Sequence, residues 1–143
     1  MTPHQRLLQL LPKEHVSLGG LSETERGLAL ALVWAGLPDG QVWTEPAVNQ
    51  ALKARLAAAA RFIGVDHVEL RRWLVDLQWL QRDDYGREYR KVPQSALREA
   101  LRPLADVVAG TDWDAQAQQL REGRAQARAE RRAAWERGQA AAA

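Results

Sequence analysis

Most of the chain carries hydrophobic residues at helical spacing, and short polar segments with glycine or proline separate these stretches. Residues 3–11 carry a leucine stripe that predicts a short helix, and residues 18–20 after it predict a turn. The next periodic segment begins at Ser22 and Glu25, whose spacing fits a capping box at the start of a helix. It is apolar on nearly every side through Trp34, so we expect this helix to lie in the core.

A short strand and two more helices are predicted next. Residues 41–43 favour the strand, and Thr44 is placed to cap the helix that follows it. Asp66 is placed to cap the next helix, with Glu69 completing a second capping box. Three leucines share one side of that helix and predict its buried face: Leu70, Leu74 and Leu77.

Residues 79–92 have the pattern of a β-hairpin, because two strand-like segments flank residues 83–86, which are polar and end in glycine. The order is helix, short strand, helix, helix and hairpin, which is the order of a winged helix-turn-helix. We therefore predict a mainly α-helical fold with a small β-hairpin. In this fold a winged helix-turn-helix domain is extended by helices at both ends.

The chain divides into four predicted parts. Residues 1–20 are a helical lead-in, and residues 21–92 are the winged-helix domain. Residues 93–110 predict a helical extension that Pro103 kinks or restarts. Residues 111–143 predict a long helix rich in alanine and arginine, with a frayed tail. This last part has only three large apolar residues with which to pack: Trp113, Leu120 and Trp135.

Composition narrows the function classes. The chain has 143 residues and no cysteine, which suits one domain and excludes disulfides, thiolate metal sites and a cysteine nucleophile. No segment has the length and apolar character of a membrane span, and the first residues lack the pattern of a secretion signal. We therefore expect a cytoplasmic protein. No catalytic or metal-binding motif is present, so we expect no enzyme activity and no cofactor.

The charge of the chain is small but unevenly placed. The net charge is +2 and the isoelectric point is 9.4, and the two values agree because all but three of the 20 basic residues are arginine. Neither residues 1–92 nor residues 93–143 form a basic domain, since each part carries a net charge of about +1. The excess gathers between Arg121 and Arg137, where six arginines accompany three glutamates.

The third predicted helix and the hairpin carry the first candidate DNA contacts. Arg71 and Arg72 could meet phosphates or guanine edges, or they could form a solvated face paired with Glu69 and Asp76. In the hairpin, strand alternation places Arg87, Tyr89 and Lys91 on one face. Arg87 and Lys91 could follow a phosphate backbone, or they could have only a structural role in the hairpin. Tyr89 is expected in the core.

Arginines of the last helix are the second group of candidate contacts, and the sequence leaves three interpretations open. They could form a basic arm that binds phosphates, or a solvated helix held by weak ion pairs. The helix could also pair with a partner chain through Trp113, Leu120 and Trp135. The candidate DNA-binding residues in this helix are Arg124, Arg128, Arg131 and Arg132.

The spacing of residues from Trp43 to Arg90 matches a family pattern. The matching positions are Thr44-Glu45, Val48-Asn49, Leu52, Asp66-His67, Leu70-Arg71-Arg72, Leu74-Val75-Asp76, Leu80, Arg82, Gly86 and Tyr89. In these positions the chain resembles a bacterial domain family of unknown function, which also occurs fused behind arsenic-repressor-type regulator heads. The resemblance implies a winged-helix fold and a part in transcription or DNA binding. The chain departs from the pattern at Gln78, where the family usually has glycine.

We therefore expect a non-enzymatic protein that binds double-stranded DNA or takes part in transcription, with contacts mainly to the phosphate backbone. The alternative is a protein-interaction or dimerisation module that uses the winged helix as a scaffold and binds no nucleic acid. The acidic neighbours of Arg71 and Arg72 favour this alternative. Asn49, on the helix before them, is expected to make a structural hydrogen bond rather than a phosphate contact.

Overall fold

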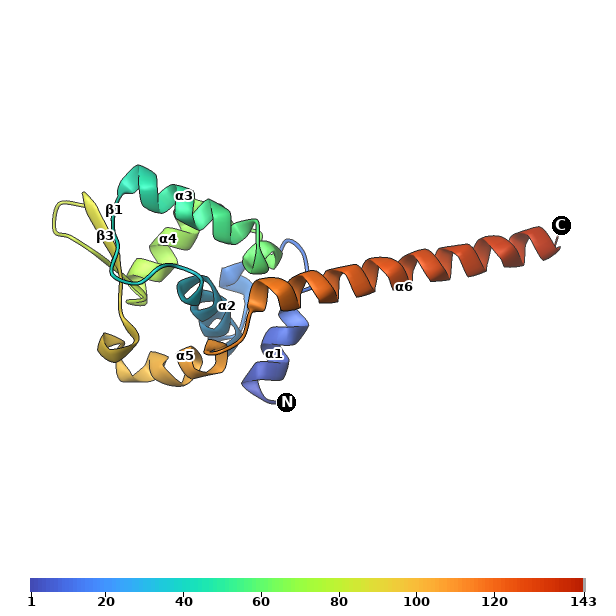
Figure 1. Ribbon diagram of the computed structural model, residues 1–143, viewed down its shortest axis with the longest axis horizontal. Coiled ribbons are helices and arrows are strands. Elements are labelled where there is room, and N and C mark those ends of the chain that lie inside the picture. Colours follow the sequence, from blue (N-terminus) through green and yellow to red (C-terminus); the bar gives the residue numbers. More distant parts are fainter. Residues whose placement is uncertain (143) are drawn as a thin grey trace.

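The computed structural model describes residues 1–142 as a helical body from which one long helix projects (Figure 1). The α-helices are α1 (Pro3–Leu10), α2 (Glu23–Ala35), α3 (Glu45–Leu56), α4 (His67–Asp76), α5 (Arg102–Val108) and α6 (Trp113–Ala142). The strands are β1 (Val42–Thr44), β2 (Leu80–Arg82) and β3 (Glu88–Lys91). Four short 3-10 turns complete the order: η1 (Leu18–Gly20), η2 (Ala59–Phe62), η3 (Gln94–Ala96) and η4 (Glu99–Leu101).

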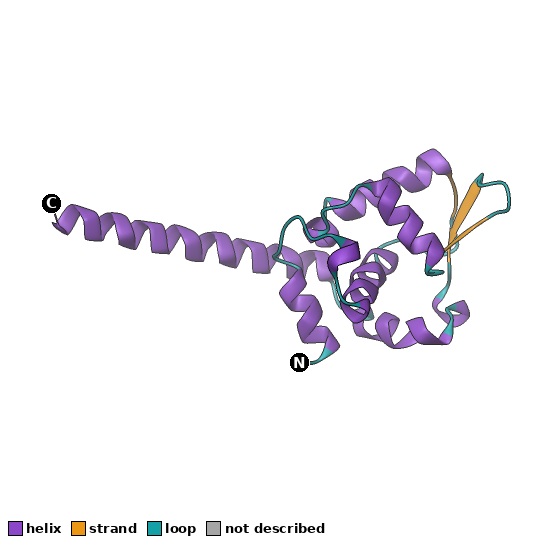
Figure 2. Ribbon diagram, turned by 180° about the vertical axis from the view of Figure 1, so that it is seen from behind, coloured by secondary structure: helices purple, strands orange, loops and turns teal. Residues whose placement is uncertain are grey.

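Helix α2 is the centre of the body, as its apolar sequence predicted. Every residue from Gly27 to Trp34 is buried, and α1, α4, α5 and η2 all pack against this helix. A helix that is apolar on all sides is stable in water only when neighbours cover it completely. The other helices surround α2 in both ribbon views (Figures 1 and 2).

The predicted terminal extensions belong to the same core as the middle of the chain. Leu7 of α1, Leu97, Val108 of α5 and Trp113 at the start of α6 are each at most 5% exposed and join one continuous cluster. Pro103 lies in the first turn of α5, so it restarts the helix instead of kinking it. The body therefore extends beyond residues 21–92 and takes in residues 1–20, residues 93–110 and the first turns of α6.

The strands form one three-stranded antiparallel sheet with the order β1-β3-β2. The predicted hairpin is its β2-β3 part, and β1 adds a third strand with Trp43 opposite Tyr89. Trp43 and Tyr89 are both buried, so the sheet closes one side of the core. The protein is thus mainly helical with a small antiparallel sheet.

Side-chain caps begin the helices where the sequence predicted them. Ser22, Thr44 and Asp66 each accept a hydrogen bond from the backbone N–H three residues later, at 3.2, 3.3 and 2.8 Å. Both predicted capping boxes are only half formed. Glu25 does not bond back to the N–H of Ser22, and its carboxylate lies 3.8 Å from the guanidinium of Arg6. Glu69 does not reach back to Asp66, because its carboxylate accepts a hydrogen bond from the indole of Trp73 at 3.2 Å.

Helix α6 projects far beyond the body in both ribbon views (Figures 1 and 2). It has 30 residues, which corresponds to about 45 Å at the usual rise of an α-helix. Only its first two turns are anchored by buried side chains, those of Trp113 and Ala117. The outer part exposes its polar side chains and Trp135, which is 65% exposed.

Gln78 ends α4 in a conformation that suits glycine. Its φ is +68°, in the left-handed region, where a side chain brings Cβ against the backbone. The resemblance described above implies glycine at this position. Gln78 makes the same backbone turn without the conformational freedom of glycine.

We therefore expect Gln78→Gly to stabilise the protein by roughly 0.5 kcal/mol, because relief of the left-handed strain exceeds the extra entropy of glycine in the unfolded chain. Urea unfolding would measure the change. Gln78→Ala is the control, since alanine keeps the Cβ and should give no gain. A lower stability for the glycine variant would contradict this explanation of the turn.

Candidate nucleic-acid interface

Arg71 on α4 points into the body and has no free face for DNA. Its guanidinium forms an ion pair with Glu45 at 3.2 Å and donates a hydrogen bond to the side-chain oxygen of Asn49. The group also lies 5.4 Å from the ring centroid of Tyr89, and the side chain is 14% exposed. Arg71 therefore joins α3, α4 and the sheet. The structural hydrogen bond expected of Asn49 is confirmed, with Arg71 as its partner.

Arg72 is the one member of the α4 pair that faces solvent. Its side chain is exposed, and the predicted pair with Asp76 does not form among residues 1–142. Val75, one turn along α4, lines a shallow groove with Arg82 of β2 and Arg98. Arg72 is thus available to a partner that approaches the outer side of α4.

The position of Lys91 contradicts the prediction that this residue contacts a phosphate backbone. The alternation along β3 does place Tyr89 and Lys91 on one face, but this face is the buried one. The Lys91 ammonium donates to the backbone oxygen of Leu37 at 2.8 Å, pairs with Asp39 at 3.1 Å and lies over the ring of Trp34. Its side chain is only 5% exposed, so Lys91 holds the β1 side of the body together and cannot reach a phosphate.

Arg87 lies in the loop before β3 and is exposed, close to the ring of Tyr85. The loop is shaped by Asp83, which accepts hydrogen bonds from the backbone N–H groups of Arg87 and Glu88 at 2.7 and 3.1 Å. The N–H of Glu88, followed by the N–H and charge of Arg87, lowers the pKa of the Asp83 carboxyl. Asp83 therefore stays ionised at neutral pH and builds the turn.

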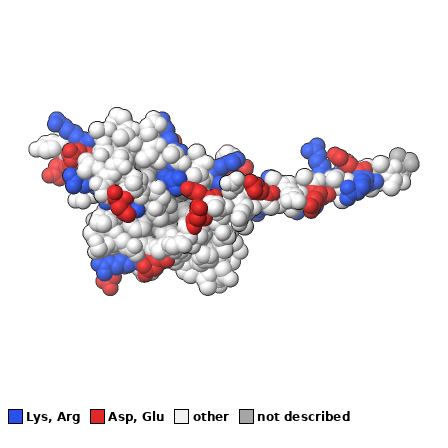
Figure 3. Space-filling view, viewed as in Figure 1, with Lys and Arg blue, Asp and Glu red and all other residues white. Residues whose placement is uncertain are grey.

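The outer surface of α4 and the hairpin carries balanced charges. Exposed arginines on this surface are Arg72, Arg82, Arg87 and Arg90, and exposed carboxylates are Glu69, Asp76, Asp84 and Glu88. The space-filling view shows blue and red groups interspersed at the end of the body that carries the hairpin (Figure 3). This surface would attract a phosphate backbone only weakly, because its carboxylates offset the charge of its arginines.

Helix α6 separates its charges by face. Counting about 100° per residue, five arginines fall on the side of α6 that begins with the buried Trp113 and Ala117. They are Arg121, Arg124, Arg128, Arg131 and Arg132, and we call this side the basic face. Glu122, Glu130 and Glu136 fall on other sides of the helix, and Trp135 lies on the basic face near its outer end. Between Arg121 and Arg132 the basic face carries no carboxylate, and at its edge Glu136 pairs with Arg132 at 3.5 Å.

Two of these arginines are anchors. The Arg121 guanidinium donates to the backbone oxygens of Ala58, Leu11 and Ala59 at 3.0 to 3.1 Å. Arg124 donates to the backbone oxygen of Pro12 at 3.2 Å. These oxygens belong to the segments that follow α3 and α1, and the Ala58 oxygen also accepts the backbone N–H of Arg61 at 3.1 Å. Arg121 and Arg124 therefore attach α6 to the body.

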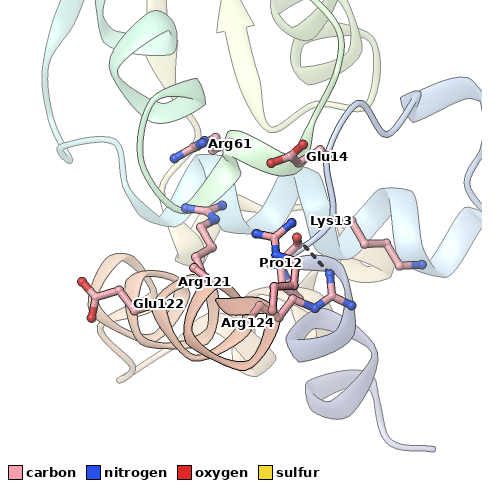
Figure 4. A pocket seen from close by; sticks show the side chains of 9 residues that line it. Pro12, Lys13, Glu14, Arg61, Arg121, Glu122 and Arg124 are labelled. Carbon is pink, nitrogen blue, oxygen red and sulfur yellow. Dashed lines mark hydrogen bonds between the residues drawn. The ribbon is translucent and has the colours of Figure 1, made fainter. Parts of the chain in front are cut away.

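A groove opens where α6 meets the body (Figure 4). Its residues come from the loop after α1, from η2 and from α6: Pro12, Lys13, Glu14, Arg61, Arg121, Glu122, Arg124, Ala125 and Arg128. The loop and η2 are joined by backbone hydrogen bonds on both sides of Val16, from Val16 N–H to Phe62 and from Gly64 N–H to Val16, at 2.9 and 2.8 Å. Only glycine fits at position 64, because a Cβ there would lie 2.7 Å from the backbone of His15.

Sequence reasoning missed Arg61, Lys13 and the anchoring role of Arg121. They lie about 50 to 110 residues apart in the chain, so no spacing rule could group them. Arg124 and Arg128 were named as candidates, and the structure places both at this groove. Arg131 and Arg132 lie further out on α6, with Arg132 in a weak pair with Glu136 at 3.5 Å.

Residues 1–142 contain no group of three or more histidine, aspartate or glutamate side chains arranged to hold a metal ion. Within the same residues, no helix combines the length and the apolar character needed to cross a membrane.

We expect Arg121→Gln to destabilise the protein by about 2 kcal/mol, because three partly buried carbonyls lose a charged donor. Thermal or urea unfolding would measure the loss. Arg124→Gln is the matched control on the same helix, and it should cost less than half as much because it removes one exposed hydrogen bond. Equal effects of the two variants would contradict the anchoring role of Arg121.

Comparison with known proteins gives one similarity. No curated protein and no solved structure matches the chain. Residues 21–91, from the start of α2 through β3, match the model of a family described as "Uncharacterized protein conserved in bacteria (DUF2087)". The match takes in α2, β1, α3, α4 and the β2-β3 hairpin, and it stops before α5 and α6. The middle of this chain is therefore similar to a conserved bacterial domain of unknown function.

Proposed function

We propose that the chain is a non-enzymatic winged-helix protein that binds duplex DNA and makes its phosphate contacts mainly through the basic face of α6. The winged-helix assignment is supported by the order α2-β1-α3-α4-β2-β3 and by the sheet order β1-β3-β2. In such a fold α3 and α4 would be the helix-turn-helix pair, and the β2-β3 hairpin would be the wing.

The observation that carries the proposal is the row of arginines on one exposed side of α6. From Arg124 to Trp135 the helix rises about 16 Å, and a DNA duplex presents one phosphate charge per ~1.7 Å of its axis. Arg128 lines the groove beside the body, and Arg131 and Arg132 follow it further out along α6. The outer part of this helix projects away from the other helices (Figure 1). Guanidinium groups bind phosphate oxygens with paired N–H donors, which suits arginine for this role.

Helix α4 and the wing would contribute less in this proposal. Arg72 and Arg87 are exposed and can reach a phosphate, but their surface carries as many carboxylates as arginines. Arg71 would act only by holding α4 against α3 and the sheet. The proposal therefore moves the main DNA contacts from the expected recognition helix to the last helix.

Fluorescence anisotropy of a labelled duplex at several salt concentrations tests this proposal. Arg128→Glu/Arg131→Glu/Arg132→Glu should weaken binding and reduce the slope of log K against log salt by about 3, because each lost phosphate contact removes roughly 0.9 from the slope.

Arg137→Glu is the matched control for each single variant, Arg128→Glu, Arg131→Glu and Arg132→Glu, since it makes the same charge change on another side of α6 and should have a much smaller effect. Unchanged binding by the triple variant, together with loss of binding by Arg72→Glu/Arg87→Glu, would place the interface on α4 and the wing instead. Absence of binding by the wild-type chain would refute the proposal.

The alternative function is an interaction module that dimerises through α6, and one observation favours it: Trp135 is 65% exposed. The other two residues of the expected pairing surface are engaged in the body, because Trp113 is buried and Leu120 is half-buried. Two copies that met through the basic face would also bring like charges together.

We therefore expect the full chain to be a monomer in light scattering at physiological salt. Trp135→Ala should leave the measured mass unchanged. A dimer that Trp135→Ala converts to a monomer would support the alternative function.

A further inference from the structure

The groove at the base of α6 concentrates positive charge beyond what the basic face of α6 supplies. Its lining contains five cations and two carboxylates, a net charge of +3 in one concavity. The cations come from three segments: Lys13 from the loop after α1, Arg61 from η2, and Arg121, Arg124 and Arg128 from α6. Such convergence of like charges is unfavourable in the empty groove, so it marks a place where an anion would be stabilised.

Arg61 of η2 and Arg121 of α6 both belong to this cluster, and in Figure 4 the guanidinium of Arg61 lies above that of Arg121. Burial, followed by repulsion from Arg61, lowers the pKa of the Arg121 guanidinium. Glu14 and Asp114 offset only part of this effect. The two guanidinium groups thus repel each other, and an anion in the groove that both of them line would offset this repulsion.

The donors are partly preorganised. Arg121 uses three of its five N–H groups for the carbonyls of Leu11, Ala58 and Ala59, and Arg124 uses one for Pro12. These bonds fix both guanidinium groups and leave other N–H donors unused, so a ligand would lose less entropy in ordering them. Arg61 has no ion-pair or side-chain hydrogen-bond partner among residues 1–142 and is free to close over a ligand.

The lining also indicates what kind of anion fits. None of the nine lining residues is aromatic, so the groove offers no ring on which a base would stack. Several guanidinium groups around one concavity match several phosphate groups in a row, since each phosphate accepts paired N–H donors. A single carboxylate would leave most of the positive charge unbalanced.

We propose that this groove is a binding site for a linear oligophosphate, either free or as the phosphate chain of a nucleotide. The site lies where α6 leaves the body, at the inner end of the basic face (Figures 1 and 4). It shares Arg128 with the DNA contacts proposed for α6 but does not involve Arg131 or Arg132. A ligand here would compete with a duplex for the inner part of that face.

Isothermal titration of the full chain with tripolyphosphate, in buffer without divalent cations, tests the site. We expect saturable binding to one site per chain. Arg61→Gln should weaken this binding about tenfold or more, and its fold should be unaffected because Arg61 is exposed and holds no other side chain. Arg137→Gln, with the same loss of charge outside the groove, should bind as the wild type does. Circular dichroism would verify that both variants are folded.

A parallel titration with a nucleoside triphosphate identifies the natural form of the ligand. Equal affinities for the two probes would indicate that the protein recognises the phosphate chain alone. Tighter binding of the nucleoside triphosphate would indicate that the natural ligand is a nucleotide. Arg131→Gln/Arg132→Gln separates the site from the proposed DNA function, because it should weaken duplex binding and leave tripolyphosphate binding unchanged. The inference is overturned if binding is not saturable, or if Arg137→Gln weakens it as much as Arg61→Gln does.

Discussion

Three hydrogen bonds from the guanidinium of Arg121 determine how the long last helix leaves the body. They end on backbone oxygens that follow α1 and α3, so they hold three parts of the chain at one point. Asp114, in the first turn of α6, adds an ion pair with Arg55 at 3.1 Å and accepts the N–H of Ala59 at 2.9 Å. Without these contacts, a helix with only two buried residues would have little to orient it.

The same anchor explains where the positive charge gathers. The basic face of α6 begins with arginines that are bonded to the body and continues with arginines that face solvent. Its inner end meets Arg61, which the contact between Gly64 and His15 brings to the same place. The small net charge of the chain thus conceals one strongly basic region. The outer side of α4 and the hairpin, in contrast, is electrically balanced.

Local signals in the sequence predicted most of the fold. The caps at Ser22, Thr44 and Asp66, and the apolar character of α2, depend on residues within a few positions of one another, which is why they could be read correctly. The shared core of the terminal segments could not be predicted in this way. It depends on contacts such as those of α1 and α5 with α2, and no periodicity shows which stripes will meet.

The candidate site was less predictable than the fold, and Lys91 shows why. Strand alternation groups residues by face but does not say which face is buried, so Lys91 was assigned to the wrong environment. Arg71 lies on the helix that was expected to contact DNA, but its guanidinium donates a hydrogen bond to Asn49 on α3 instead. The arginines of α6 could be named because they are close in sequence, whereas their common groove with Arg61 depends on the tertiary fold.

We propose that a nucleic acid meets the basic face of α6 rather than the outer side of α4. Hydrogen–deuterium exchange of the full chain, with and without a saturating duplex, tests it most directly, because the exposed part of α6 should exchange readily when nothing is bound. The duplex should slow exchange within residues 121–135 and change exchange in α4 and the hairpin little. Protection confined to α4 and the hairpin, with residues 121–135 unchanged, would contradict it.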